Sequence, residues 1–240
     1  MRNATAVIVG AGDYIGAAIV RRFAAEGYIV LAARRNGDKL AALVDEITAA
    51  GGICHARSAD ARKEEEVAAL MTEADAIAPL EVVVFNVGGN VNFPLLETTE
   101  RVFRKVWEMA CYAGFLTGRE AARHMVPRGR GSIFFTGATA SLRGGKGYTA
   151  FAAAKFGLRA LAQSMARELG PQHIHVAHLV IDAGVDTAWV RQRMEAAGRS
   201  PGPDRLMNPA SIAETYWQLH IQPRDAWTHE LDLRPAEETW

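Results

Sequence analysis

The chain of 240 residues is 49% hydrophobic, which is enough apolar material to bury one sizeable core. Its 27 basic and 27 acidic residues give a formal net charge of +0, so nothing in the balance indicates nucleic acid or an anionic membrane as a partner. The two cysteines, Cys54 and Cys111, are too few for a disulfide framework, and no apolar run approaches the ~20 residues of a membrane span. We expect one cytoplasmic domain over residues 1–240, without a signal peptide because the first strand begins close to the N-terminus.

The beginning of the chain is its most informative part. Residues 4–9 form a continuous apolar run rich in β-branched side chains, which is typical of a fully buried strand. From Ile15 onward the apolar residues fall at helical spacing. The turn between contains Gly10, Gly12 and Gly16, and glycines let the backbone approach a phosphate closely. Because the start of the helix also offers unpaired N–H groups and its positive dipole end, the pattern predicts dinucleotide binding rather than a simple tight turn.

Strand and helix patterns then alternate along most of the chain. Further strands are predicted at residues 28–33, 53–58, 81–86, 132–136, 174–181 and 227–233, and helices around residues 40–47, 67–71, 100–125, 149–169, 189–198 and 209–219. Repeated βα units specify a parallel sheet covered by helices on both sides, with right-handed crossovers. We therefore expect an α/β protein with a three-layer Rossmann fold, a doubly wound parallel sheet of about seven strands.

The end of the second predicted strand bears on the choice of cofactor. In a dinucleotide fold, an acidic side chain at this place would hold the adenosine ribose of NAD. Here Ala33 takes that place, and Arg34 and Arg35 follow it. Arginine matches a phosphate dianion bidentately, so the pair favours NADP(H) over NAD(H). The alternative is that both are solvated surface arginines at the end of a strand. Asp13 in the glycine turn argues for NAD, because its negative charge would oppose a 2′-phosphate.

The glycine turn and the motifs beyond it resemble those of the short-chain dehydrogenase/reductase superfamily, and the resemblance extends from Ala4 to about Pro235. Gly10 and Gly16 match the outer glycines of the family's turn, whereas Tyr14 replaces the middle one. The resemblance implies a nicotinamide-dependent oxidoreductase that acts on a small-molecule substrate. It also implies a homodimer or homotetramer, because members usually assemble in that way.

The resemblance assigns roles to residues at the ends of later strands. Asp60 matches the acidic residue that contacts adenine, and Asn86-Val87-Gly88 is similar to the family's Asn-Ala-Gly signature. Lys155 lies where the family has its ribose-binding lysine, and Thr187 where a threonine holds the nicotinamide carboxamide. The residues expected to contact the cofactor are Gly10, Gly12, Asp13, Tyr14, Ile15, Gly16, Arg34, Arg35, Asp60, Ala61, Asn86, Val87, Gly88, Lys155, Val185 and Thr187.

The catalytic pattern departs from that of the family. Members use a Tyr-x-x-x-Lys pair with a serine before it and a supporting asparagine, but here Phe151, Ala138 and Cys111 take these positions. Hydride delivery to a carbonyl creates a developing alkoxide that needs a proton donor, and a phenol beside a lysine ammonium can be that donor. Phenylalanine has no proton to give. Loss of positioned acid–base help typically costs about 10²–10⁴ in rate, so the ordinary mechanism should be badly impaired.

Tyr148 is a candidate replacement for the missing tyrosine. It lies two helical turns before Lys155, about 10 Å along the axis, and helical side chains lean toward the N-terminus. The same spacing occurs in enoyl-acyl-carrier-protein reductases, a branch of the superfamily that reduces carbon–carbon double bonds. Thr139 is the first candidate for the lost serine hydroxyl. Both residues also have ordinary structural explanations, as an aromatic at a helix start and a hydroxyl that satisfies a turn.

Two classes of function follow from these observations. The leading hypothesis is an NADP(H)-dependent oxidoreductase that transfers a hydride to or from a carbonyl or activated alkene, with Tyr148 as proton donor and Lys155 and Thr139 in support. The alternative is a catalytically inactive NADP(H)-binding sensor or partner subunit. A third, weaker hypothesis is a hydride-transfer enzyme whose substrate supplies its own acid.

The remaining expectations concern the C-terminal third and the surface. Residues 188–208 correspond to the family's mobile lid over the substrate, and the tail that ends in Trp240 is a candidate subunit contact. No metal is expected, because the three histidines within residues 173–178 have no carboxylate at metal-ligand spacing. Arg143 and the other basic loop residues are interpreted as solvated surface.

Overall fold

Seven parallel strands form one sheet in the computed structural model, which describes residues 2–198, 200, 202 and 205–238. The strand order is β3-β2-β1-β4-β5-β6-β7, so the prediction of a doubly wound α/β fold with about seven strands is confirmed. The strands are β1 (Thr5–Val9), β2 (Ile29–Arg34), β3 (Ile53–Ser58), β4 (Leu80–Phe85), β5 (Gly131–Thr136), β6 (Ile174–Ile181) and β7 (Glu230–Leu233). The α-helices are α1 (Ile15–Ala25), α2 (Ala41–Ala49), α3 (Glu64–Ile77), α4 (Glu100–Trp107), α5 (Ala113–Met125), α6 (Thr149–Leu169), α7 (Ala188–Ala196) and α8 (Pro209–His220).

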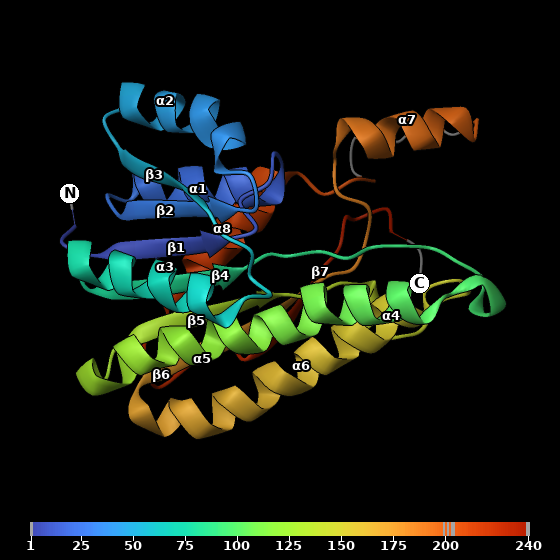
Figure 1. The fold of residues 1–240 in the computed structure, drawn as a ribbon. Coiled ribbons are helices and arrows are strands. Elements are labelled where there is room, and N and C mark those ends of the chain that lie inside the picture. The colour runs from blue at the N-terminus through green and yellow to red at the C-terminus, as the bar shows by residue number, and fades with distance from the viewer. Residues whose placement is uncertain (1, 199, 201, 203–204, 239–240) are drawn as a thin grey trace.

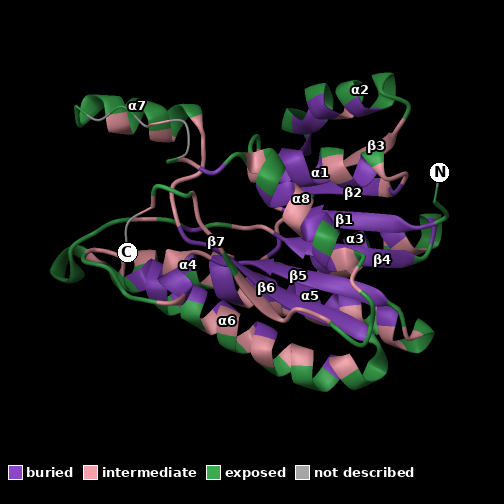
Figure 2. Cartoon of the chain, turned by 180° about the vertical axis from the view of Figure 1, so that it is seen from behind, coloured by how far each residue is buried: buried purple, intermediate pink, exposed green. Residues whose placement is uncertain are grey.

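Helices cover both faces of the sheet (Figure 1). On one face α1, α2 and α8 pack over an apolar cluster that includes Ile19, Phe23 and Tyr216. On the other face α3, α5 and α6 pack over a second cluster that includes Phe85 and Phe135. The five inner strands are almost wholly buried, whereas the edge strands β3 and β7 are mostly half-buried (Figure 2). Burial on both sides explains why each inner strand reads as an unbroken apolar run.

The order of the strands fixes where a ligand can bind. The chain moves outward from β1 through β2 to β3, then crosses back to β4 on the other side of β1. Such a switch point leaves a crevice at the carboxyl ends of the strands, because the connections on either side turn away from each other. The residues that follow β1 and β4, including Gly10 and Asn86, therefore lie at its rim.

Two boundaries differ from the sequence expectations. The helical region over residues 100–125 is interrupted by a wide π-turn, Glu108–Tyr112, which separates α4 from α5. The last strand begins at Glu230 rather than at Trp227, whose ring instead stacks on His175 at 4.8 Å between ring centroids. The expected subunit contact at Trp240 and residues 199, 201, 203 and 204 of the expected lid lie outside the described residues.

None of the helices in the described part of the chain combines the length and the apolar character needed to cross a bilayer. In the same part of the chain, no cluster of three or more His, Cys, Asp or Glu side chains could hold a metal ion.

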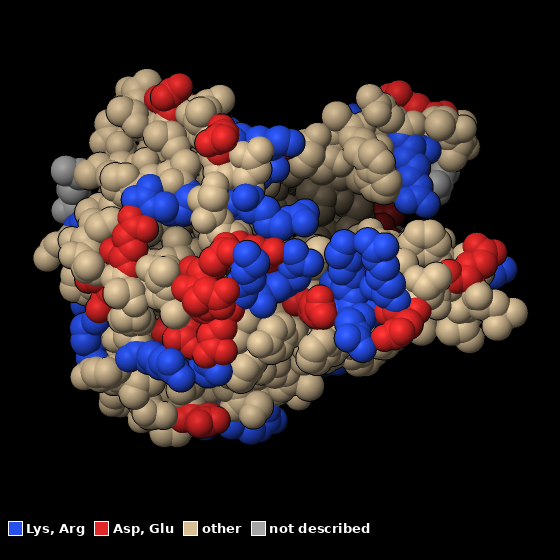
Figure 3. All heavy atoms as spheres, in the orientation of Figure 1, with Lys and Arg blue, Asp and Glu red and all other residues tan. Residues whose placement is uncertain are grey.

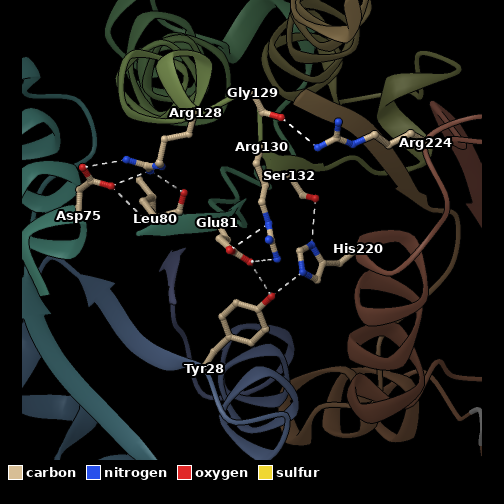
Figure 4. A network of polar contacts seen from close by, with 10 residues as sticks. All are labelled: Tyr28, Asp75, Leu80, Glu81, Arg128, Gly129, Arg130, Ser132, His220 and Arg224. Carbon is tan, nitrogen blue, oxygen red and sulfur yellow. Dashed lines mark hydrogen bonds and ion pairs between the residues drawn. The ribbon is translucent and has the colours of Figure 1, made fainter. Parts of the chain in front are cut away.

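A polar network lies at the amino ends of the strands, opposite the crevice (Figure 4). The His220 ring links the Tyr28 hydroxyl, 2.6 Å from Nε2, to the Ser132 hydroxyl, 2.9 Å from Nδ1. The Tyr28 hydroxyl also donates to the Glu81 carboxylate at 3.3 Å, and Arg130 forms an ion pair with Glu81 at 3.0 Å. This network ties α8 to β4, β5 and the start of β2.

This network makes the fold sensitive to acid. Burial, with the nearby charges of Arg2 and Arg130, lowers the pKa of His220 from 6.5 to about 4. A histidine whose pKa falls on folding contributes stability that is present above its unfolded pKa and is lost as the pH falls through the folded value. For a shift of this size the loss approaches about 3 kcal/mol. We therefore expect the free energy of unfolding to fall between about pH 6.5 and pH 4, and less steeply in His220→Gln.

Chemical denaturation at several pH values measures this dependence. His173→Asn is the matched control, because His173 is exposed and its left-handed backbone, with φ of 65°, suits asparagine. An unchanged pH dependence in His220→Gln would contradict the assignment.

Candidate functional site

A continuous cleft lies at the carboxyl ends of the strands. It consists of a hollow of about 810 Å³ on the side of β5 and β6 and a second of about 520 Å³ on the side of β2 and β3. Gly10, Gly12 and the segment Asn86-Val87-Gly88 line both, so the two hollows meet at the glycine turn. Figure 3 shows the surface hollowed beside the projecting α7, with basic side chains along the rim. The two hollows have the arrangement that an extended, two-part ligand requires.

The glycine turn is clamped between the ends of β2 and β4. The Gly10 amide donates to the Ala33 carbonyl at 2.9 Å, and the Asn86 side-chain amide donates to the Gly10 carbonyl at 3.1 Å. Gly10 has a φ of +90°, and a Cβ there would lie 2.6 Å from the Asn86 carbonyl oxygen. A Cβ at Gly16 would collide with the Gly10 carbonyl, whereas one at Gly12 would meet nothing within 4 Å. Two glycines are thus needed for packing, and the third leaves open backbone toward the cleft.

The first turn of α1 faces this open backbone. Tyr14 precedes the helix without a side-chain hydrogen bond to it, so the helix is not capped by its own sequence. The N–H groups of Ile15 and Gly16 have no carbonyl one turn earlier to accept them, and both residues line the cleft. This combination fits a pyrophosphate, since it offers unpaired donors and the positive end of a helix dipole beside room for backbone approach.

Basic side chains surround the hollow on the side of β2 and β3. Arg34, Arg35, Lys39 and Arg62 all line it, although Lys39 and Arg62 were not among the residues predicted from the sequence. Arg34 forms an ion pair with Asp13 at 2.8 Å, which occupies part of its guanidinium. The hollow therefore carries an excess of positive charge beside the ends of β2 and β3.

Asp60 and Ala61 also line this hollow, as expected for residues after β3. Arg62 donates to the Asp60 carboxylate at 2.9 Å through Nε, and this hydrogen bond holds the pKa of Asp60 below its usual value against the opposing effect of burial. The carboxylate is thus already paired, and it offsets little of the remaining positive charge.

Lys155 is buried at the opposite end of the cleft, with 3% of its surface exposed. Its ammonium donates to the carbonyl of Thr136 at 2.7 Å and to that of Val87 at 3.3 Å. The Phe151 ring centroid lies 5.9 Å from Nζ. Burial lowers the pKa of Lys155 from 10.5 to about 8, because the charged form loses its hydration.

Tyr148, Phe151 and Thr139 line the same hollow as Lys155. Tyr148 directly precedes α6, with φ of −107° and ψ of 22°, so the helical spacing used to relate it to Lys155 begins one residue too early. Among the described residues, the Lys155 ammonium contacts main-chain carbonyls and the Phe151 ring rather than the Tyr148 hydroxyl. The structure thus brings the two groups to one cleft without a direct hydrogen bond between them.

Thr187 and Val185 lie on the loop between β6 and α7 and also line this hollow. The Thr187 hydroxyl oxygen accepts the Val190 amide at 3.1 Å and caps α7, and Val185 pairs with Met207 in an isolated bridge. Thr187 therefore joins α7 to the cleft, and Val185 joins the loop before α8 to it.

Arg143 and Asp182 form a pair that the sequence did not reveal. Arg143 was interpreted as solvated surface, but it lines the cleft and forms an ion pair with Asp182 at 3.2 Å. Asp182 is 1% exposed and also pairs with Arg234 at 2.8 Å. Burial opposes ionisation of Asp182, but the neighbouring Thr139 and the two arginines hold its pKa below the usual value. The two arginines come from loops far from Asp182 in the sequence, so no local motif marks the cluster.

The sheet, the switch point and the glycine turn define a protein of the dinucleotide-binding Rossmann class. A family model described as short chain dehydrogenase matches residues 4–197. The chain therefore belongs to the short-chain dehydrogenase/reductase family of oxidoreductases, as its motifs indicated.

Three relatives cover almost the whole chain. A short-chain dehydrogenase from Rhodopseudomonas palustris is 61% identical with a TM-score of 0.86, over 98% of this chain and 100% of that chain. The 1-deoxy-11-beta-hydroxypentalenate dehydrogenase of Streptomyces exfoliatus is 31% identical, over 100% of this chain and 95% of its own length. A metagenomic short-chain oxidoreductase solved in complex with NADP is 27% identical with a TM-score of 0.83, over 98% of this chain and 99% of that chain.

The packing of the glycine turn leads to a prediction for stability. Gly10→Ala adds a methyl group at a left-handed position against the main chain of Asn86, so we expect it to lower the free energy of unfolding by at least about 1–3 kcal/mol. Thermal and urea unfolding without cofactor measure this effect. Gly12→Ala is the matched control and should unfold nearly as the wild type does, since its Cβ meets open space. Equal stability of the two variants would show that the clamp is absent.

Proposed function

We propose that this protein uses NADP(H) to reduce a small molecule, or to oxidise it in reverse, at a carbonyl group or an activated carbon–carbon double bond. The observation that carries the proposal is the continuous cleft, in which the uncapped start of α1 lies between a cationic hollow and the buried Lys155 ammonium. The bound nicotinamide would supply the hydride. The protein then has to hold the cofactor, exclude water and provide a proton.

The charges around the second hollow support NADP(H) over NAD(H). Four cationic side chains line it, and its one lining carboxylate, Asp60, is already paired with Arg62. An arginine fork matches a phosphate better than it matches a ribose hydroxyl. Arg34 and Arg35 are therefore assigned to the 2′-phosphate, and Asp13 is a competitor for Arg34.

The role assigned to Lys155 follows from its hydrogen bonds. Two of the three N–H groups on Nζ are directed to carbonyl oxygens, which leaves the third for a ribose hydroxyl of the cofactor. With a pKa of about 8, the ammonium is mostly protonated at neutral pH. Phe151, 7% exposed, packs beside it and limits the access of water. Lys155 thus places a positive charge in the cleft where negative charge would develop.

Two phenols, Tyr14 and Tyr148, line the hollow that contains Lys155. Tyr148 is assigned as the proton donor because it directly precedes α6, the helix that carries Lys155, whereas Tyr14 precedes α1 at the glycine turn. Thr139 is given a positioning role, since it lies beside Asp182 and helps to hold the pKa of that carboxyl below its usual value. The proposed mechanism uses Tyr148 as its single protein acid.

A second candidate function is an NADP(H)-binding sensor or partner subunit without redox turnover. It is favoured by Ala138, Phe151 and Cys111, which stand where the family has its serine, tyrosine and asparagine. This function requires NADPH binding without oxidation of NADPH across a broad panel of ketones, aldehydes and enones. One good substrate would eliminate it.

The proton donor is tested by Tyr148→Phe. We expect turnover to fall by about 10²–10⁴ while NADPH affinity is unchanged, because the change removes only the hydroxyl. Steady-state rates and NADPH titration provide the two measurements. Tyr112→Phe is the control, since Tyr112 stacks between Trp107 and Phe115 rather than in the cleft. Full activity of Tyr148→Phe would exclude the assigned role and favour a substrate that supplies its own acid.

The cofactor assignment is tested by Asp13→Asn. Removing this carboxylate frees Arg34, so NADPH should bind about 2- to 5-fold more tightly, as expected for loss of one solvent-exposed ion pair. NADH affinity should stay the same, because NADH lacks the 2′-phosphate. Calorimetric titration of both nucleotides gives the comparison. An equal gain for the two nucleotides would mean that Arg34 does not bind the 2′-phosphate.

A further inference from the structure

Arg143 lines the wall of the cleft, and the proposed function gives this cation no contact with the cofactor. It follows the short 3-10 turn Thr139–Ser141 in the loop between β5 and α6, and its amide donates to the Thr139 carbonyl at 3.1 Å. The loop then returns to Tyr148, where a Cβ at Gly145 would lie 3.2 Å from the tyrosine ring. The same loop therefore carries both Arg143 and the proposed proton donor along one hollow.

Asp182 holds Arg143 in place without occupying it fully. The shorter ion pair of Asp182 is with Arg234, at 2.8 Å. The two contacts from Arg143 are longer, at 3.2 and 3.3 Å, and come from its terminal nitrogens. Among the described residues, the Nε–H of Arg143 has no acceptor, and half of the side chain is exposed. The guanidinium is thus oriented by a buried anion while part of its fork remains available.

The charges lining this hollow favour an anion. Its cations are Lys155, which is directed at main-chain carbonyls, and Arg143, which is exposed. Its carboxylate is Asp13, which is paired with Arg34 on the glycine turn. Gly144 and Gly145 continue the wall beside Arg143, and a Cβ at Gly144 would meet nothing within 4 Å. The hollow therefore has open space next to its exposed cation.

We propose that Arg143 binds a carboxylate of the substrate, so that the substrate class is that of oxo acids and unsaturated acids. This inference rests on the proposed function and deepens it. Arginine is suited to this role because its planar fork pairs with a carboxylate through two parallel hydrogen bonds. Asp182 and Thr139 are positioning residues, since they act on the substrate through Arg143.

The experiment compares carboxylic acids with their own carboxamides. A panel of 2-oxo, 3-oxo and 2,3-unsaturated acids, each beside its amide, is assayed by NADPH oxidation with the wild type, Arg143→Met, Arg143→Lys and Lys146→Met. Lys146 is the control because it is exposed on the same loop and does not line the cleft. Thermal melting and NADPH titration of each variant separate folding and cofactor binding from substrate recognition.

We expect kcat/KM for the acid to exceed that for its amide by about 10-fold or more in the wild type, as expected for a charge-assisted pair. Arg143→Met should remove this preference with NADPH affinity unchanged, Arg143→Lys should restore part of it, and Lys146→Met should keep it. Calorimetry with the turned-over acid on the NADP⁺ complex should show binding that Arg143→Met loses.

Equal turnover of acids and amides would overturn the carboxylate assignment and leave the oxidoreductase proposal standing. A loss of NADPH affinity in Arg143→Met would also overturn it, by assigning Arg143 to the cofactor. Absence of NADPH binding in the wild type would instead refute the proposed function itself, and the carboxylate assignment with it.

Discussion

The site depends on the close approach of the main chain at the end of β1 to the main chain at the end of β4. Gly10 lies against the Asn86 carbonyl, and Gly16 lies against Gly10, so no side chain fits between these segments. The approach holds the first turn of α1 at the switch point of the sheet, where its unpaired N–H groups face the cleft. The two hollows of the cleft lie on either side of this turn.

Two ends of one cleft follow from that placement, and each has a different electrostatic character. Toward β3 the hollow is lined by four cationic side chains, which suits a phosphate. Toward β6 the ammonium of Lys155 is buried and held by carbonyls, which suits a reaction from which water is kept out. Arg34 and Arg35 were predicted from their place after the second strand, and Lys155 from the family resemblance.

The fold was predictable because its signals are local. Strands buried on both faces read as apolar runs, and each is followed by helical spacing, so the elements and their order emerge without tertiary information. The glycine turn was predictable for the same reason, since Gly10, Gly12 and Gly16 lie within one short segment. The late start of β7 was not predictable. Trp227 lies next to residues with strand-like patterning, but its ring stacks on that of His175 in β6 instead.

The site was predictable only where its residues follow a motif. The partner of Arg143 could not be predicted, because Arg143 lies in the loop after β5 whereas Asp182 directly follows β6, and the two meet only when β5 and β6 pair. Lys39 follows β2 and Arg62 follows β3, yet both line one hollow. Their spacing along the chain does not predict that they lie close together. The relation between Tyr148 and Lys155 was inferred from helix geometry, but Tyr148 precedes the helix, where that geometry no longer applies.

The most direct test of the account is a calorimetric titration of the wild-type protein with NADPH and, separately, with NADH. If the glycine turn holds a pyrophosphate and the neighbouring arginines hold a 2′-phosphate, both nucleotides bind and NADPH binds more tightly. Absence of binding heat and of any thermal stabilisation with either nucleotide would contradict the account at its base.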